Sequence, residues 1–173
     1  MAEKLKIAFL EVAQKKQAIS LLSKAFNAAV DDMTSGFDTE HTNDNIAPVT
    51  FTASIGDKVV GVIRCAYYDP AYAGLFCLAV EPTYRQQGIG HALMNYAEDY
   101  ISTEWMRGNP GIISLWDETK RKNPSSTYYE KMGYQMTPYE ERNEDGLPCL
   151  YKRVNTDPIP PRQKPDRRPG SRG

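Results

Sequence analysis

Two glycines lie where an apolar segment gives way to an amphipathic helix. The loop reads Arg85-Gln86-Gln87-Gly88-Ile89-Gly90, and the apolar segment 73–80 precedes it. Backbone N–H groups at the start of a helix lack intrahelical partners and carry partial positive charge, so they bind phosphate oxygens. Glycine lets the backbone approach such an anion closely, and His91 adds charge at the edge of the loop. We therefore predict a binding site for a cofactor that carries a diphosphate.

Two widespread phosphate loops do not fit this segment. A Walker A loop continues from its last glycine into Lys-Ser or Lys-Thr, whereas Gly90 is followed by His91 and Ala92. The dinucleotide fingerprint G-x-G-x-x-G would need glycine at the position of Leu93. The sequence thus argues against both a P-loop NTPase and an enzyme that binds a dinucleotide cofactor.

The segment LAVEPTYRQQGIGHAL (78–93) instead resembles the acetyl-CoA motif of the GNAT superfamily, the GCN5-related N-acetyltransferases. That motif is R/Q-x-x-G-x-G/A, and Arg85, Gly88 and Gly90 occupy its three defining positions. A second segment, NPSSTYYEKMGYQ (123–135), is similar to the other family signature, Y-E-K-x-G-F/Y. The usual Asn position of that signature is Lys122 here, and Asn123 is shifted by one residue.

The resemblance implies how acetyl-CoA is held. It places the pantetheine arm beside the backbone groups of Leu78 and Val80 and beside the side chain of Asn123. It places the pyrophosphate on the loop; the expected cofactor contacts there are Arg85, Gln86, Gln87, Gly88, Ile89 and Gly90. In this family an amine attacks the thioester directly.

The resemblance also assigns a proton donor to the departing thiolate. Tyr129 occupies that position, and a tyrosine of pKa ~10 can protonate a thiolate whose acid has a pKa of ~8.5. Tyr129 could instead be a core aromatic, since Ser125, Tyr129 and Met132 share one face of an expected helix, and Tyr128 is the rival donor. The general base stays open between a water chain and several carboxylates: Asp31, Asp32, Asp69, Glu81 and Asp117.

Hydrophobic periodicity predicts the elements that position these residues. Strands are expected at 4–11, 49–55, 58–68, 73–80, 111–116, 134–139 and 148–154, with Gly56-Asp57 as a hairpin turn. Helices are expected over 18–29 and after Gly90, and residues 31–48 form a loop or a short helix. A last helix is expected from Asn123-Pro124 to Gly133, because Asn is a good N-cap and Pro suits the first helical position.

This order predicts an α/β fold. The resemblance implies a mixed, mostly antiparallel sheet of about six to seven strands, splayed at the acetyl-CoA site and flanked by about four helices. We expect one domain over residues 1–155. Residues 156–173 are rich in Pro and Arg and poor in apolar side chains, so we expect a disordered tail.

Composition limits the remaining classes. The three cysteines are widely spaced and there are only two histidines, so we expect no metal site and a cytoplasmic protein. No segment approaches the ~18 apolar residues of a membrane span. Residues 152–173 hold seven basic and two acidic side chains, a balance of +5, which leaves 14 basic and 20 acidic, a balance of −6, for the rest. An acidic body favours cationic partners.

The expected function is acetyl transfer from acetyl-CoA to a primary amine of a small molecule, peptide or protein. The alternative is a non-catalytic acyl-CoA-binding sensor or interaction module. We do not expect binding to a membrane or to nucleic acid, and we expect a monomer or homodimer. The acceptor segments, 31–48 and 139–147, carry no substrate code that identifies the amine.

Overall fold

The structure is a computed structural model, and it describes residues 3–38 and 48–156. Side chains of residues 35–38 are outside this description, as are residues 39–47 of the predicted acceptor segment 31–48 and the predicted tail from residue 157 onward. Within the described residues, no helix is long and apolar enough to cross a membrane.

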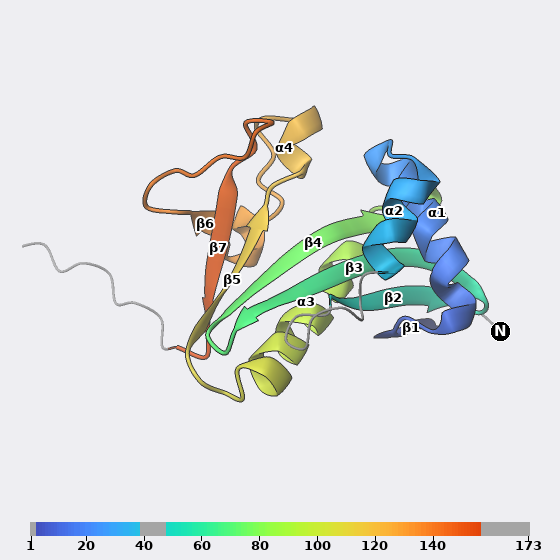
Figure 1. The fold of residues 1–173 in the computed structure, drawn as a ribbon, viewed down its shortest axis with the longest axis horizontal. Helices are drawn as coiled ribbons and strands as arrows, with labels where there is room; N and C mark the ends of the chain where they lie inside the picture. The colour runs from blue at the N-terminus through green and yellow to red at the C-terminus, as the bar shows by residue number, and fades with distance from the viewer. Residues whose placement is uncertain (1–2, 39–47, 157–173) are drawn as a thin grey trace, which may run out of the picture.

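Seven strands form one sheet in the order β1-β2-β3-β4-β5-β7-β6 (Figure 1). Every neighbouring pair is antiparallel except β4 and β5, which are parallel. The predicted mixed, mostly antiparallel α/β sheet is therefore confirmed. The strands are β1 Leu5–Phe9, β2 Val49–Ile55, β3 Lys58–Asp69, β4 Tyr72–Val80, β5 Gly111–Trp116, β6 Gln135–Met136 and β7 Cys149–Val154.

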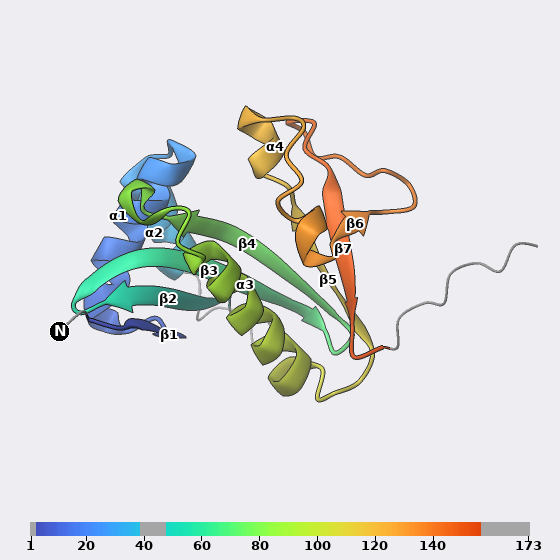
Figure 2. The ribbon, with the colours of Figure 1, turned by 180° about the vertical axis from the view of Figure 1, so that it is seen from behind.

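In the described part of the chain, four α-helices lie around the sheet: α1 Lys15–Phe26, α2 Val30–Asp38, α3 Ile89–Tyr100 and α4 Thr119–Lys122. In Figure 1, α1 and α2 lie in front of the β3–β4 half of the sheet, whereas α3 lies behind it, as Figure 2 shows. The apolar stripe of α1 packs on one face through Ala18 and Leu22. That of α3 packs on the other through Leu93 and Ala97. Each helix thus buries the apolar side chains whose helical spacing predicted it.

The parallel pair β4–β5 is short. It joins three residues of each strand, Tyr72–Gly74 and 112–114, and then the strands diverge. β5 is paired along its whole length with β7, so both strands turn away from β4 together (Figure 1). Beyond Gly74 and Ser114 the two strands are therefore unpaired and separate, which we call the gap beside β4; the loop at residues 85–90 follows the far end of β4, and α4 follows the far end of β5 (Figure 2).

A polar cluster on the α3 side ties the two diverging parts together. The Tyr134 hydroxyl donates to Glu98 of α3 at 2.9 Å, and Lys152 Nζ of β7 lies 3.0 Å from the same carboxylate. Glu98 is only 9% exposed, so water competes little for these contacts. Contacts with Glu98 of α3 thus fix Tyr134 and β7 relative to the helix, on the face of the sheet that α3 covers.

Two expected elements are wrong. No helix runs from Pro124 to Gly133; residues 124–129 form turns, followed by a single 3-10 turn at Glu130–Met132. Asn123 Oδ1 accepts the N–H of Ser125, so its capping tendency closes a local turn. The expected strand 134–139 is reduced to β6, because Pro138 has no N–H to offer a ladder.

Candidate active site

The loop after β4 has the backbone of an anion-binding turn. Gln86 and Gly88 have φ of +64° and +78°, and α3 begins at Ile89. The first helical bond joins Ala92 N–H to the Gly88 carbonyl at 2.9 Å, so the earlier amides are left outside the helical ladder. Arg85 Nε donates to the Val80 carbonyl at 3.3 Å, which fixes the loop to the end of β4.

Within the loop, the side chains from Arg85 to Gly88 are exposed and Ile89 is buried. A Cβ on Gly88 would meet no atom within 4 Å, so the space above it is open to a ligand. The loop can therefore present N–H groups to an anion while Ile89 anchors it to the core. The predicted contacts of Gln86 and Gln87 stay a prediction.

A bulge interrupts the ladder between β3 and β4. The ladder pairs Arg64 with Phe76 and Val62 with Ala79, so two residues of β4 face one residue of β3. Cys77 lies in this bulge with a φ of +54°, which is rare for a residue other than glycine. The bulge shifts the alternation of β4 by one residue.

That shift decides which backbone groups face the gap. Beyond the bulge, Glu81 N–H donates to the Val60 carbonyl of β3 at 2.8 Å. Because successive residues of a strand point their backbone groups to opposite sides, Leu78 and Val80 direct theirs away from β3. They therefore face the side on which β5 has diverged, and these are the two residues expected to pair with the pantetheine arm.

A pocket of about 500 Å³ lies beside the phosphate loop. Its lining contains a histidine, a lysine, three aliphatic hydroxyls, an amide, a tyrosine and a methionine: His91, Lys131, Ser125, Ser126, Thr127, Asn123, Tyr128 and Met132. The Lys131 ammonium, the N–H group of His91 and the hydroxyls suit phosphate and ribose oxygens, whereas Tyr128 and Met132 offer surface to a flat ring. The residues present thus fit the nucleotide end of a coenzyme.

Tyr128 closes this pocket against the loop. A Cβ on Gly90 would come within 2.6 Å of the Tyr128 hydroxyl, so glycine at this position permits the contact. Sequence reasoning weighed Tyr128 only as a rival proton donor and missed its place beside the loop. The missing helix is the reason, since helical periodicity misplaces both tyrosines.

Tyr129 lies deeper, in the core. It is 6% exposed, and its ring packs edge-to-face against Tyr128 and Tyr134 at centroid distances of 5.1 and 6.0 Å. Burial raises the pKa of Tyr129 well above its ordinary value, and Tyr128, Asp117 and Glu118 add to the rise. In the described residues, Glu130 Oε2 is the fully enclosed side-chain polar atom that lacks a partner. The Tyr129 hydroxyl makes no hydrogen bond to another described residue either, so it belongs to the small part of Tyr129 that solvent reaches.

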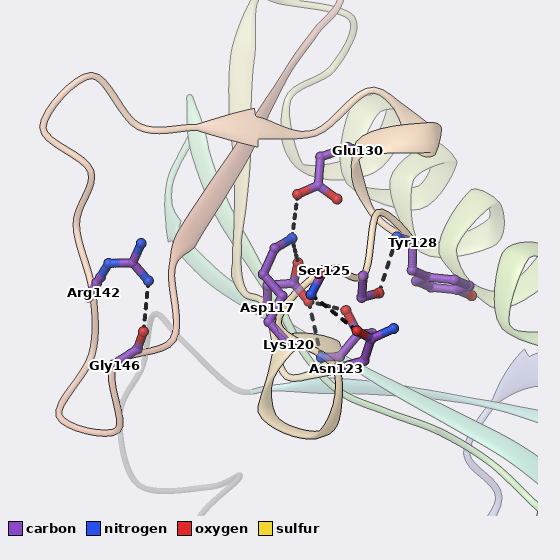
Figure 3. Close-up of polar contacts among 10 residues, drawn as sticks. Asp117, Lys120, Asn123, Ser125, Tyr128, Glu130, Arg142 and Gly146 are labelled. Atoms are coloured by element: carbon purple, nitrogen blue, oxygen red, sulfur yellow. Dashed lines mark hydrogen bonds and ion pairs between the residues drawn. The ribbon is translucent and has the colours of Figure 1, made fainter.

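An ion cluster fixes the segment that carries these tyrosines (Figure 3). Asp117 is fully buried, and Lys120 Nζ lies 2.7 Å from its Oδ2. The same ammonium contacts Glu130. Lys120 thus links the end of β5 to the 3-10 turn after Tyr129, on either side of Asn123.

The base candidates are engaged in local contacts. Asp117 belongs to the ion cluster, Asp69 Oδ1 accepts the Ala71 N–H at 2.7 Å, and Glu81 lies 3.0 Å from Lys58. Asp31 and Asp32 occupy the exposed first turn of α2. The geometry therefore singles out none of these carboxylates as a base. The described residues hold no group of three or more His, Cys, Asp or Glu side chains that could bind a metal ion.

Comparison with known proteins agrees with this geometry. Residues 15–134 match the Acetyltransferase (GNAT) family. A [Ribosomal protein bS18]-alanine N-acetyltransferase of Escherichia coli (strain K12) is 33% identical over 63 residues, which are 36% of this chain and 38% of that protein. The chain thus matches well under two thirds of the length of that relative.

Solved structures share the fold. An aminoglycoside 6'-N-acetyltransferase complexed with coenzyme A has a TM-score of 0.63 at 21% identity, over 90% of this chain and 99% of that one. The ribosomal-protein-S18-alanine N-acetyltransferase from Escherichia coli has a TM-score of 0.62 at 18% identity, over 90% and 97%. The family match covers more than half of the chain, and the protein belongs to the GNAT acetyltransferase family.

Proposed function

We propose that the protein is an acetyl-CoA-dependent N-acetyltransferase that moves an acetyl group directly to a primary amine. The observation that carries this proposal is the gap beside β4. The bulge at Cys77 turns the backbone of Leu78 and Val80 into that gap, and the phosphate loop lies at its open end. One end of this strand thus suits a diphosphate, and the stretch before it suits an extended amide-containing arm.

The residues divide the work of binding. The loop amides from Gln86 to Gly90 would hold the pyrophosphate, with Arg85 fixing the loop to β4. His91, Lys131 and the hydroxyls of the pocket would hold the nucleotide end, and Asn123 orders the turn that lines it. Bound acetyl-CoA supplies the thioester whose carbonyl carbon the amine attacks; the C–N bond forms as the C–S bond breaks.

Two tyrosines are candidates to donate the proton that the leaving thiolate requires. The Tyr128 hydroxyl lies against Gly90, at the diphosphate end of the site. The sulfur of coenzyme A lies at the far end of its arm from the diphosphate, so Tyr128 is poorly placed to protonate it. Tyr129 packs behind Tyr128, toward the core, and we assign the proton-donor role to it. Burial raises the pKa of Tyr129, so its hydroxyl keeps its proton at neutral pH and is available as a donor.

The test is thiol release from acetyl-CoA with a panel of amines. The panel should include a peptide that begins with alanine and an aminoglycoside, since these are the acceptors named for the relatives above. Release that depends on an added amine, with one acetyl group found on the product, supports the proposal. If acetyl-CoA raises the melting temperature but no amine releases thiol, the chain is an acyl-CoA-binding module instead.

A further inference from the structure

The face of the sheet opposite α3 carries aromatic side chains that the packing of the fold does not require. Four large side chains there are 37–50% exposed: Tyr68, Tyr72, Ile112 and Trp116. Ile113 and Leu115 point the other way, into the core beside α3, so Ile112 and Trp116 face away from that helix. In Figure 1, α1 and α2 stop short of this part of the sheet, and no described helix lies in front of β5 and β7.

Two of these rings, Tyr68 and Tyr72, are held in place by contacts with each other and with β4 and β5. Tyr68 and Tyr72 stack with centroids 4.9 Å apart and an interplanar angle of 27°. The Tyr72 hydroxyl hydrogen-bonds Ser114 Oγ across the strands at 2.8 Å. A Cβ on Gly74 would come within 2.9 Å of the Tyr68 ring, so the ring lies directly on the β4 backbone. Trp116 extends the same face along β5. We call Tyr68, Tyr72 and Trp116 the aromatic platform.

The platform begins where the gap beside β4 begins. Gly74 and Ser114 form the last pair that joins β4 to β5, and the Tyr68 ring covers Gly74. Trp116 is at the end of β5, on the far side of the gap. A molecule on the platform thus reaches the gap from the face opposite α3.

The charges near the platform favour a cation. Glu118 follows Trp116 by two residues, and the Glu141 backbone bonds Cys149, the ladder partner of Trp116. Arg121 pairs with both Glu118 and Asp145, and Arg142 lies next to Glu141 in the same loop, so the groups at this end are three carboxylates and two guanidinium groups. Arg153 lies at the other end, opposite Ile112. Aromatic faces attract cations, and carboxylates at one end add to that attraction.

We propose that the platform selects the acceptor, and that the acceptor is an amine with a second, non-reacting cationic group. That group lies on the rings of Tyr68, Tyr72 and Trp116, while the reacting amine extends into the gap. The inference rests on the proposed acetyl transfer, and it names the substrate class of that reaction.

The experiment compares three primary amines that share a butyl chain. One ends in trimethylammonium, one in the neutral tert-butyl isostere and one in a carboxylate. Each has a single reactive amine, so thiol release reports one event. We expect kcat/KM for the trimethylammonium compound to exceed that of its isostere by about tenfold, the middle of the range for contacts between cations and rings. The carboxylate compound should be the poorest acceptor.

Variants assign the preference to the platform. Trp116→Leu and Tyr68→Leu should each reduce the tenfold preference to about threefold or less, with an unchanged KM for acetyl-CoA. Trp116→Phe should keep part of it. Tyr96→Leu is the matched control, because Tyr96 is also an exposed tyrosine, at 38%, but lies on α3. It should keep the full preference.

Two outcomes overturn the proposal, and they differ. Equal kcat/KM for the cation and its isostere, or a preference that survives in both leucine variants, removes the platform but leaves acetyl transfer in place. If no amine releases thiol while acetyl-CoA still binds, the acetyl-transfer function fails, and the platform proposal fails with it.

Discussion

At the scale of single residues, two adjacent tyrosines have different surroundings. Tyr128 is 37% exposed and touches the phosphate loop, whereas Tyr129 is 6% exposed and packs in the core. The sequence placed both on one helix and chose Tyr129 as the proton donor by motif position alone, with Tyr128 as the rival. Their surroundings differ because the chain forms turns, not a helix, between Asn123 and Glu130. Helical spacing therefore does not give the directions of the two rings.

Tyr129→Phe should lower turnover by ~100-fold or more, because it removes a positioned acid and keeps the ring. The melting temperature should barely change, since the hydroxyl has no recorded partner among the described residues. Because burial raises the pKa of Tyr129, its proton is retained through pH 10, and parent turnover should show no loss below that pH from its ionisation. Steady-state kinetics from pH 7 to 10 measures both effects.

Tyr128→Phe is the matched control, since it makes the same chemical change one residue away. We expect turnover within a few-fold of the parent and a weaker affinity for acetyl-CoA. An active Tyr129→Phe beside an inactive Tyr128→Phe would transfer the acid role to Tyr128.

Gly88→Glu should abolish the stabilisation of the protein by acetyl-CoA. Gly88 has a φ of +78° and open space above it, so a glutamate there strains the backbone and projects negative charge toward the diphosphate. Gly108→Glu separates these effects, because Gly108 also has a positive φ, +76°, and open space but lies away from the loop. It should lose a similar amount of stability and keep the full thermal shift with acetyl-CoA. Equal shifts in the two variants would contradict the site.

At the scale of elements, the strands could be predicted and the bulge could not. The apolar runs at 49–55, 58–68 and 111–116 match the observed strands within a residue at either end. Such runs are informative because burial on one or both faces dictates residue type. The bulge at Cys77 depends on how β3 and β4 align, and no local residue marks it. The predicted pairing of Leu78 and Val80 with the pantetheine arm therefore came from family resemblance, and the orientation of their backbone is compatible with that prediction.

The missing helix at residues 124–133 has a local cause. Ser125, Ser126 and Thr127 offer the backbone side-chain partners, and such residues favour turns over helix interiors. Tyr128 N–H lies 3.4 Å from Ser126 Oγ, and Ser125 N–H is already held by Asn123. Asn-Pro is equally compatible with the start of a helix and with a turn, so the capping residues alone could not reveal the error.

Lys120→Met should destabilise both the protein and its grip on acetyl-CoA. The change leaves Asp117, which is fully buried, beside Glu130 with no cation between them. Removing one partner of a buried pair costs 3–5 kcal/mol, and since Glu130 is partly exposed we expect about 2–3 kcal/mol here. Urea denaturation measures the loss, and titration with acetyl-CoA should show weaker binding because the turn at Asn123 loses its anchor.

Arg121→Met is the neighbouring control. Arg121 also pairs with two carboxylates, Glu118 and Asp145, but its side chain is 47% exposed. Exposed pairs contribute less than about 1 kcal/mol, so stability and acetyl-CoA affinity should change little. Equal effects of the two substitutions would show that the Lys120 cluster is not an anchor.

At the scale of the whole molecule, the fold is a sheet in two arms that share a short seam. Only three residue pairs join β4 to β5, while the Tyr134–Glu98–Lys152 contacts close the arms from the α3 side. On the α3 side, one hydrophobic core nevertheless continues across both arms. That core runs beneath the seam and includes Cys65, Leu93 and Ile113, all fully buried.

The core should make the protein sensitive to alkali. Burial raises the pKa of the Cys65 thiol from 9.0 to about 12. Between these values the unfolded chain has lost the proton and the folded chain keeps it, so the free energy of unfolding falls as pH rises. The slope for one such group is about 1.4 kcal/mol per pH unit, and the stability is intact below about pH 9.

Cys65→Ala should therefore lower stability at pH 7 through its cavity and yet flatten the decline measured by urea denaturation from pH 9 to 10. Val60→Ala, which opens a cavity in the same core cluster without removing a thiol, should keep the parent slope. Parallel declines in Cys65→Ala and the parent would mean that the Cys65 thiol ionises in the folded protein as it does in the unfolded chain.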